Sequence, residues 1–314
     1  MEAVSRNSTL VYRYTLDNEY PPPMIEYAPV RWIPFVFAAL FPVLVARVLA
    51  AARATRAPWL CAAALAPILL FIALVLRGAM GRGDGDAFRM YETQTVLHLC
   101  AGHTLVGMLL AFAAKWIEIE RQAIVGVFLA HLGIAYTVVA VVCTCVGFPL
   151  AFDAVEERRI CGYRLVSAPL IVAIGMVLLG ATLALYHTDG RRGGGADAGT
   201  AGRLAIVWIP AALLACWASF ELARMSMPTK SAANTSEALF YCLSVLPLAG
   251  TLTVWTGRAE GLLAGVGDGG STVTAAAGAG RGAAPCGCGR TLIAGPCQGC
   301  AHEASLWRAM QKYA

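Results

Sequence analysis

The hydrophobic positions of this chain gather into seven long blocks separated by short polar segments. Each block holds at least about 18 mostly apolar residues, close to the length that a helix needs to cross the hydrocarbon core of a bilayer. The pattern therefore predicts an all-α fold, a polytopic seven-helix transmembrane bundle. The predicted spans cover residues 33–50, 58–76, 95–116, 123–152, 165–186, 204–222 and 238–256.

Polar segments on either side of these blocks divide the chain into three parts. Residues 1–30 are polar and lack the basic and then apolar start of a signal peptide, so the first span is expected to act as the insertion signal. Residues 31–256 form the predicted bundle. Residues 257–314 are rich in Gly and Ala and contain a cysteine cluster. Such a segment buries too little side chain to offset its ordering entropy, so we expect a flexible tail that ends in a short amphipathic helix.

Composition strengthens the membrane assignment. Hydrophobic residues make up 58% of the 314 positions and charged residues only 14%, with a mean hydropathy of +0.65. Soluble domains carry about 25% charged residues. The net charge of +5 arises from basic residues spread over all the loops, whereas a nucleic-acid-binding protein gathers them on one face. The sequence predicts membrane lipids as partners and no nucleic acid.

Two glycosylation sequons bear on orientation, which the distribution of Lys and Arg leaves open. They begin at Asn7 and Asn234, and with seven spans both fall on the same side of the membrane. We therefore predict an extracellular or luminal amino terminus, in the plasma membrane or an endomembrane. The alternative is a chance occurrence, because the pattern is common.

Several polar residues lie inside the third predicted span. Gln94 and His98 are four residues apart and share a helical face, while His103 lies about 140° around the helix from His98. His131 lies in the fourth span. Three histidines in neighbouring spans could form a proton relay or a metal site, or each could form a hydrogen bond across the bundle. The HxxxH and HExxH spacings of helical metal sites are absent.

Charged residues meet at the junction of the sixth and seventh spans. Glu221 and Arg224 are three residues apart on one face and can neutralise one another. Glu237 and Tyr241 open the seventh span at a spacing of four. We expect Arg224 to be held by Glu221, Glu237 or both. This set is either a structural cluster at the membrane edge or a binding site for the headgroup of an amphiphilic substrate.

The cysteines fall into two sets. Those in the predicted spans are expected to be small apolar fillers, and Cys161 lies alone in a predicted loop. In the tail, Cys286, Cys288, Cys297 and Cys300 form CxC followed by CxxC. This pattern suits either a small zinc knuckle or palmitoylation. The chain has no Walker loop, GxSxG motif or CxxCH haem motif, so we expect no cofactor, no ATP-driven pump and no defined enzyme.

Short motifs resemble the fungal RTA-like family of seven-span, lipid-translocating exporters. They include tyrosines in the opening segment (Tyr12, Tyr14) and a Tyr-x-x-Gln start to the third span (Tyr91, Gln94). The sixth span ends in Phe220-Glu221-x-x-Arg224, where the family usually has Tyr-Arg-x-x-Glu. The seventh span begins Glu237-x-x-x-Tyr241, and Ser244 replaces the family's Asp.

The resemblance implies movement of lipids or sphingoid bases, export and resistance to toxic amphiphiles. On this interpretation Gln94, His98, His103, Glu221, Arg224, Glu237 and Tyr241 are the candidate substrate-binding residues. Two alternatives remain: a seven-transmembrane receptor-like lipid sensor, and a small intramembrane enzyme of a biosynthetic pathway.

Overall fold

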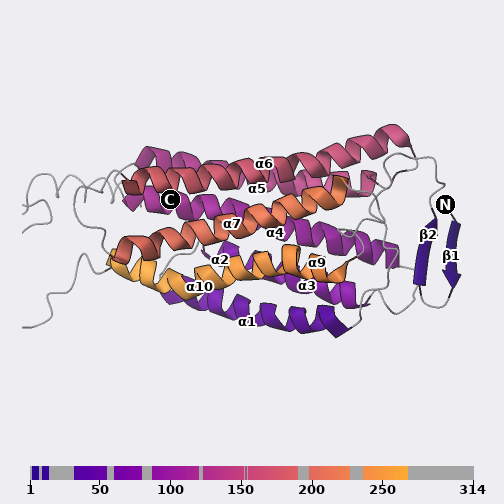
Figure 1. Cartoon of the computed structure of the whole chain (residues 1–314), viewed down its shortest axis with the longest axis horizontal. Helices are drawn as coiled ribbons and strands as arrows, with labels where there is room; N and C mark the ends of the chain where they lie inside the picture. The colour runs from indigo at the N-terminus through magenta and orange to yellow at the C-terminus, as the bar shows by residue number, and fades with distance from the viewer. Residues whose placement is uncertain are drawn as a thin grey trace, which may run out of the picture. The chain divides into compact units, whose positions relative to one another are not determined.

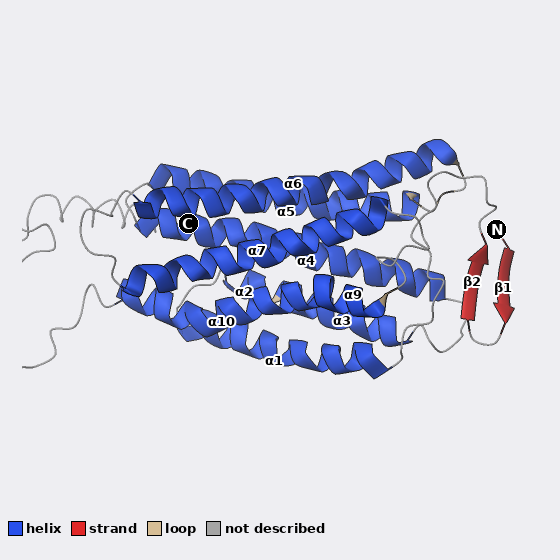
Figure 2. Ribbon diagram, in the orientation of Figure 1, coloured by secondary structure: helices blue, strands red, loops and turns tan. Residues whose placement is uncertain are grey.

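The computed structural model describes residues 2–6, 9–13, 32–54, 60–79, 87–119, 123–151, 153, 155–189, 198–226 and 236–267. The predicted bundle is helical, and a short antiparallel pair of strands, β1 (Glu2–Arg6) and β2 (Thr9–Arg13), lies in the polar amino-terminal segment (Figures 1 and 2). The helical elements are α1 (Trp32–Ala54), α2 (Leu60–Ala63), α3 (Leu65–Ala79), α4 (Ala87–Ile119), α5 (Ala123–Leu150), α6 (Glu156–Asp189), α7 (Ala198–Ser226), α9 (Glu237–Phe240), the π-helical turn η2 (Tyr241–Val245) and α10 (Leu246–Gly267).

Within these described residues, six helical segments are long and apolar enough to cross a membrane. They are Trp32–Arg53, Arg89–Ala114, Ile124–Leu150, Glu156–Leu185, Ile206–Ser226 and Glu237–Gly257. Large apolar side chains on their outer faces are exposed, including Trp32, Phe128 and Ile134. In a membrane, such apolar faces contact lipid chains rather than water. The chain is a multi-pass integral membrane protein.

The second apolar block forms two short helices instead of one long one. The helix is interrupted at Ala64, between α2 and α3, and α3 alone has 15 residues. The pair nevertheless runs antiparallel to α1 along most of its length. At one end Phe35 of α1 lies against Gly78 of α3, and at the other Val48 and Ala51 lie beside Ala63 of α2.

The observed helices extend past the predicted spans at several ends. Helix α4 begins eight residues before the predicted span and α6 begins nine residues before it, so Cys161 lies in a helix and the loop prediction was wrong. Helix α10 continues to Gly267, into the segment predicted to be a flexible tail. The hydrophobic window reports only the apolar part of a helix, whereas the hydrogen-bonded helix continues through the polar interface.

Helix α4 occupies the centre of the bundle. It contacts α2, α3, α5, α6 and α7, and four-fifths of its apolar segment is buried. Close approach to its neighbours depends on glycine. A Cβ atom added to Gly133 of α5 would lie 2.8 Å from the carbonyl oxygen of Gly107 in α4, and one added to Gly102 would overlap the ring of Trp217 in α7. Small residues let helix backbones meet closely in membranes.

A second glycine pair joins α5 to α6. A Cβ atom on Gly162 would lie 2.6 Å from the carbonyl oxygen of Gly147 and 2.3 Å from the backbone nitrogen of Ala151. These contacts are between backbones, so no side-chain rotation can relieve them. The α4–α5–α6 side of the bundle is therefore held by direct backbone contact.

The last span is interrupted by the π turn η2. The amide of Leu246 bonds the carbonyl oxygen of Tyr241, five residues back. Phe240, Ser244, Leu248 and Leu252 are all buried at a spacing of four. In a regular α-helix each step of four residues moves the face by about 40°, so such a stripe drifts around the axis. The wider π turn offsets part of that drift and keeps the stripe facing the bundle.

We predict that Gly133→Ala lowers the free energy of unfolding by about 1–3 kcal/mol, because the new methyl group forces α4 and α5 apart. Gly175→Ala is the matched control, since a Cβ atom there meets nothing within 4 Å. It should be neutral or slightly stabilising, because Ala favours the helix. Unfolding of both variants in mixed detergent micelles tests this, and equal effects would contradict the close-packing role of Gly133.

Candidate functional site

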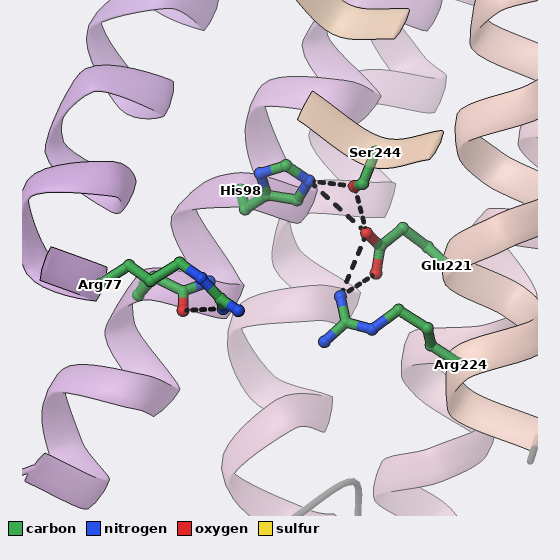
Figure 3. A network of polar contacts seen from close by, with 6 residues as sticks. Arg77, His98, Glu221, Arg224 and Ser244 are labelled. Carbon is green, nitrogen blue, oxygen red and sulfur yellow. Dashed lines mark hydrogen bonds and ion pairs between the residues drawn. The ribbon is translucent and has the colours of Figure 1, made fainter. Parts of the chain in front are cut away.

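Polar and charged side chains from α3, α4, α7, α9 and η2 meet inside the bundle, near the end where α3 and α7 finish and α4 and α9 begin. Figure 3 shows Arg77, His98, Glu221, Arg224 and Ser244. We call this set the buried polar network. Its members are Arg77, Gln94, His98, Glu221, Arg224, Glu237 and Ser244.

Glu221 is the centre of the network and is fully buried. Its Oε2 atom accepts a hydrogen bond of 2.9 Å from Nη1 of Arg224, one turn further along α7. Its Oε1 atom accepts a hydrogen bond from the hydroxyl of Ser244 and lies 3.5 Å from Nε2 of His98. One carboxylate therefore joins α7 to α4 and to η2.

His98 and Ser244 form a directional chain that ends on this carboxylate. The Nε2 atom of His98 lies 2.6 Å from the hydroxyl oxygen of Ser244. Because Ser244 donates its only hydrogen to Glu221, it must accept one from Nε2–H of His98. The other ring nitrogen of His98, Nδ1, is buried and has no hydrogen-bond partner among the described residues.

Arg77 lies in the last turn of α3 and makes the remaining polar contacts of the network. It donates to Oε1 of Gln94 over 3.3 Å and lies 3.6 Å from the carboxylate of Glu237. Its guanidinium also sits 4.1 Å from the centre of the Phe240 ring. Arg77 is 3% exposed, so these contacts take the place of its hydration.

The ring of Phe240 lies close to both guanidinium groups. Arg77 lies over it at 4.1 Å and Arg224 at 5.3 Å from its centroid. The π face of the ring favours both cations, so it lowers the cost of placing two positive charges near one another. The network therefore contains two guanidinium groups and two carboxylates, whose charges cancel. The imidazole of His98 is its fifth ionisable side chain.

Local structure places Glu237 and Tyr241. Ser236 caps α9 by accepting a hydrogen bond from the amide of Leu239, and Glu237 lies in the first turn, where the helix dipole favours a carboxylate. Tyr241 follows one turn later and stacks on Phe37 of α1, with ring centroids 4.6 Å apart. Glu237 keeps a side-chain exposure of 13%, against 0% for Glu221.

The three histidines do not form one group. His103 lies on another face of α4, where Nδ1 is 2.7 Å from the hydroxyl of Tyr136, and that hydroxyl donates to the carbonyl oxygen of Pro169. His131 is on the exposed face of α5 and bonds the carbonyl oxygen of Val127 in its own helix. Separate hydrogen bonds, rather than a three-histidine relay, account for these residues.

The sequence prediction brought together five residues that the structure also brings together: Gln94, His98, Glu221, Arg224 and Glu237. Arg224 is held by Glu221, as expected. The network is buried inside the bundle, near the end where α3 and α7 finish. Arg77 was not among the predicted site residues, although a cation in the last turn of an otherwise apolar helix is a signal for it, and the bond from Ser244 to Glu221 was not predicted either.

Other sequence predictions fall elsewhere. Among the described residues, no group of three His, Cys, Asp or Glu side chains could hold a metal ion. The sequon residues Asn7 and Asn234, and Cys286, Cys288, Cys297 and Cys300, lie outside the described residues. Of the cysteines in the spans, Cys100 is buried, but Cys145, Cys216 and Cys242 are exposed and do not fill the core.

We predict strong energetic coupling between Glu221 and Arg224. Glu221→Gln should cost about 3–5 kcal/mol of unfolding free energy, because it leaves a guanidinium buried beside a neutral amide. Glu221→Gln combined with Arg224→Gln should cost less than the sum of the single changes.

The matched control is the exposed pair between Arg158 and Asp153, 3.5 Å apart. Breaking it with Arg158→Gln should cost less than about 1 kcal/mol. Unfolding in mixed micelles measures all four variants. Additive effects at Glu221 and Arg224 would show that their contact contributes nothing specific.

Comparisons with known proteins add no assignment to this geometry. The resemblance to the RTA-like family therefore stays a prediction carried by the motifs quoted above. No family model, no curated protein and no solved structure matches the chain.

Proposed function

We propose that this protein is a seven-span membrane protein that binds and moves amphiphilic lipids carrying a cationic amine, of the sphingoid-base type. The observation that carries the proposal is the buried polar network. Ionisable groups inside a membrane bundle are costly, and they generally mark the path of a substrate, ion or proton. Here four charged side chains and a histidine lie between helices, beside a π turn.

The chemistry of the network suits such a ligand. A sphingoid base carries an ammonium group, which needs a carboxylate, and hydroxyl groups, which need acceptors. Glu237 is the more accessible carboxylate and its pairing with Arg77 is the looser one, at 3.6 Å against 2.9 Å for Glu221 and Arg224. The Nδ1 atom of buried His98, which has no hydrogen-bond partner in the described part of the chain, can accept a hydroxyl hydrogen.

The π turn supports movement as well as binding. Such turns in α-helices occur frequently at functional sites. Ser244 lies within η2 and is bonded to both His98 and Glu221, so a change in the network acts on the turn directly. A ligand amine that displaces Arg77 from Glu237 would alter the first turn of the same span.

Seven crossings are part of the proposal. Helices α2 and α3 together cover residues 60–79, and 20 residues of helix extend about 30 Å, the thickness of the hydrocarbon core. Their antiparallel packing on α1 supports a second crossing, since α1 could not otherwise be followed by α4 in the same direction. The amino terminus and the segment between α7 and α9 then share one side.

We predict that the carboxyl-terminal tail lies on the side opposite the amino terminus, in the cytosol. A glycan acceptor introduced after residue 280 should remain unmodified, while the acceptor at Asn7 or Asn234 is modified. Cell expression followed by glycosidase digestion and gel mobility measures this. If the tail acceptor were glycosylated, the tail would lie outside the cytosol. That result would contradict an odd number of crossings with an outside amino terminus.

We predict that Glu237→Gln reduces flipping of a fluorescent sphingoid base in proteoliposomes at least about tenfold, because a charge-assisted contact is worth roughly 1.5–3 kcal/mol. Glu157→Gln is the matched control, since it removes an exposed carboxylate of α6 and should leave the rate unchanged. Flipping of a fluorescent phospholipid without an amine is measured in the same way. It shows whether the protein selects lipids that carry an amine.

Two outcomes would change the proposal. If folded Glu237→Gln protein flips the sphingoid base at the rate of the unaltered protein, the network is only structural. If the protein binds the base in a manner that needs Glu237 but moves none of it, the lipid-sensor alternative replaces transport.

A further inference from the structure

Arg159 is a buried arginine that the polar network does not use. It lies in the first turns of α6 and is 4% exposed. Its Nε atom is buried without a hydrogen-bond partner, and its side chain makes no ion pair with another described residue. A guanidinium removed from water costs several kcal/mol unless a negative or polar group replaces the water, so this position calls for a ligand.

A pocket of about 280 Å³ lies beside this side chain. It is lined by Arg159, Ile160, Tyr163, Arg164 and Ser167. Positions 160, 163, 164 and 167 form one stripe along α6, and Arg159 adjoins it one turn before Tyr163. The pocket therefore carries two guanidinium groups and a phenol, which are hydrogen-bond donors, and the hydroxyl of Ser167, which donates to the carbonyl oxygen of Arg164.

The nearby carboxylates do not neutralise the pocket. Glu156 and Glu157 begin α6 but are exposed and do not line it. The carboxylate of Asp153 accepts a hydrogen bond of 2.9 Å from the amide of Val155 and lies 3.5 Å from Arg158, which is itself exposed. Among the described acidic groups, none therefore occupies the place of an anion beside Arg159.

The pocket also lies near the amino-terminal end of a candidate membrane span, where lipid headgroups are expected. Arg159 is the fourth residue of α6, one turn before Gly162, which contacts the end of α5 at Gly147 and Ala151. A planar guanidinium binds phosphate through two parallel hydrogen bonds, and phospholipid headgroups carry a phosphate.

We propose that Arg159 and Arg164 form a binding site for a phosphate group, presented by an anionic phospholipid at this membrane surface. Arg159 supplies the buried, oriented contact, and Arg164, which is exposed, supplies the outer charge. Tyr163 and Ser167 add hydroxyl groups to the wall. The site is separate from the buried polar network and does not depend on the proposed transport function.

The test uses the full-length protein in nanodiscs of phosphatidylcholine with and without 20 mol% (about one lipid in five) phosphatidic acid. Phosphatidic acid should raise the unfolding temperature of the unaltered protein, and native mass spectrometry should detect the bound lipid. Arg159→Gln should weaken that binding at least about tenfold, because it removes a charge-assisted, bidentate contact. Arg159→Lys should bind with intermediate affinity, since it keeps the charge but not the planar fork.

Arg158→Gln is the matched control, because Arg158 is adjacent, exposed and paired with Asp153. It should bind phosphatidic acid as the unaltered protein does. A second arm adds inorganic phosphate to the protein in detergent. Stabilisation by phosphate that needs Arg159 supports the site with free phosphate as a ligand, whereas stabilisation only by the lipid assigns it to the headgroup.

Equal binding of phosphatidic acid by Arg159→Gln, Arg159→Lys and the unaltered protein would overturn the proposal. So would an equal loss in Arg158→Gln and Arg159→Gln, since it would reflect general surface charge. If Arg159→Gln does not fold, the comparison of Arg159→Lys with Arg158→Gln decides.

Discussion

Charge pairing away from water is the interaction on which the arrangement of α3, α4, α7 and α9–η2 depends. A lipid chain is as apolar as a leucine side chain, so apolar contacts alone do little to choose one helix register over another in a membrane. A buried guanidinium is more demanding, because only a nearby acceptor offsets its lost hydration. Arg77 meets acceptors on α4 and α9, and Glu221 meets donors on α7, α4 and η2. Rotating any one of these helices would leave a charge without its partner.

The bundle combines this polar side with a side built on close backbone contact. Glycines bring the backbones of α4 and α5, and those of α5 and α6, into direct contact, and those contacts have little freedom to adjust. The polar side contains hydrogen bonds that can exchange partners, and a π turn. Helix α4 belongs to both sides. This division favours rearrangement of α3, α7 and the last span against a fixed α4–α5–α6 group.

The sequence predicted the features of this structure that are local. Long apolar blocks identified the helices, and the spacing of Glu221 and Arg224 identified their contact, because one helical turn brings residues three apart together. The same helical periodicity placed His98 and His103 on different faces of one helix, and in the structure they contact different neighbours. The pair between Arg77 and Glu237 joins distant parts of the chain, and no spacing rule relates them. The early starts of α4 and α6 were missed because their first turns are polar, and hydropathy cannot distinguish a polar helical turn from a loop.

The π turn also determines how this span tolerates a change in length. A π turn is equivalent to one additional residue in an otherwise regular α-helix, and each residue of an α-helix advances the face by about 100°. Loss of one residue between Tyr241 and Val245 would convert η2 to regular helix while α10 kept its packing. Because the five residues of the π turn cover about the same angle as four α-helical residues, Glu237 and its cap at Ser236 would keep their direction toward Arg77. Insertions and deletions are usually absorbed by loops, but in this protein one helix interior carries a position where the loss of one residue would leave the pairing of charges in place.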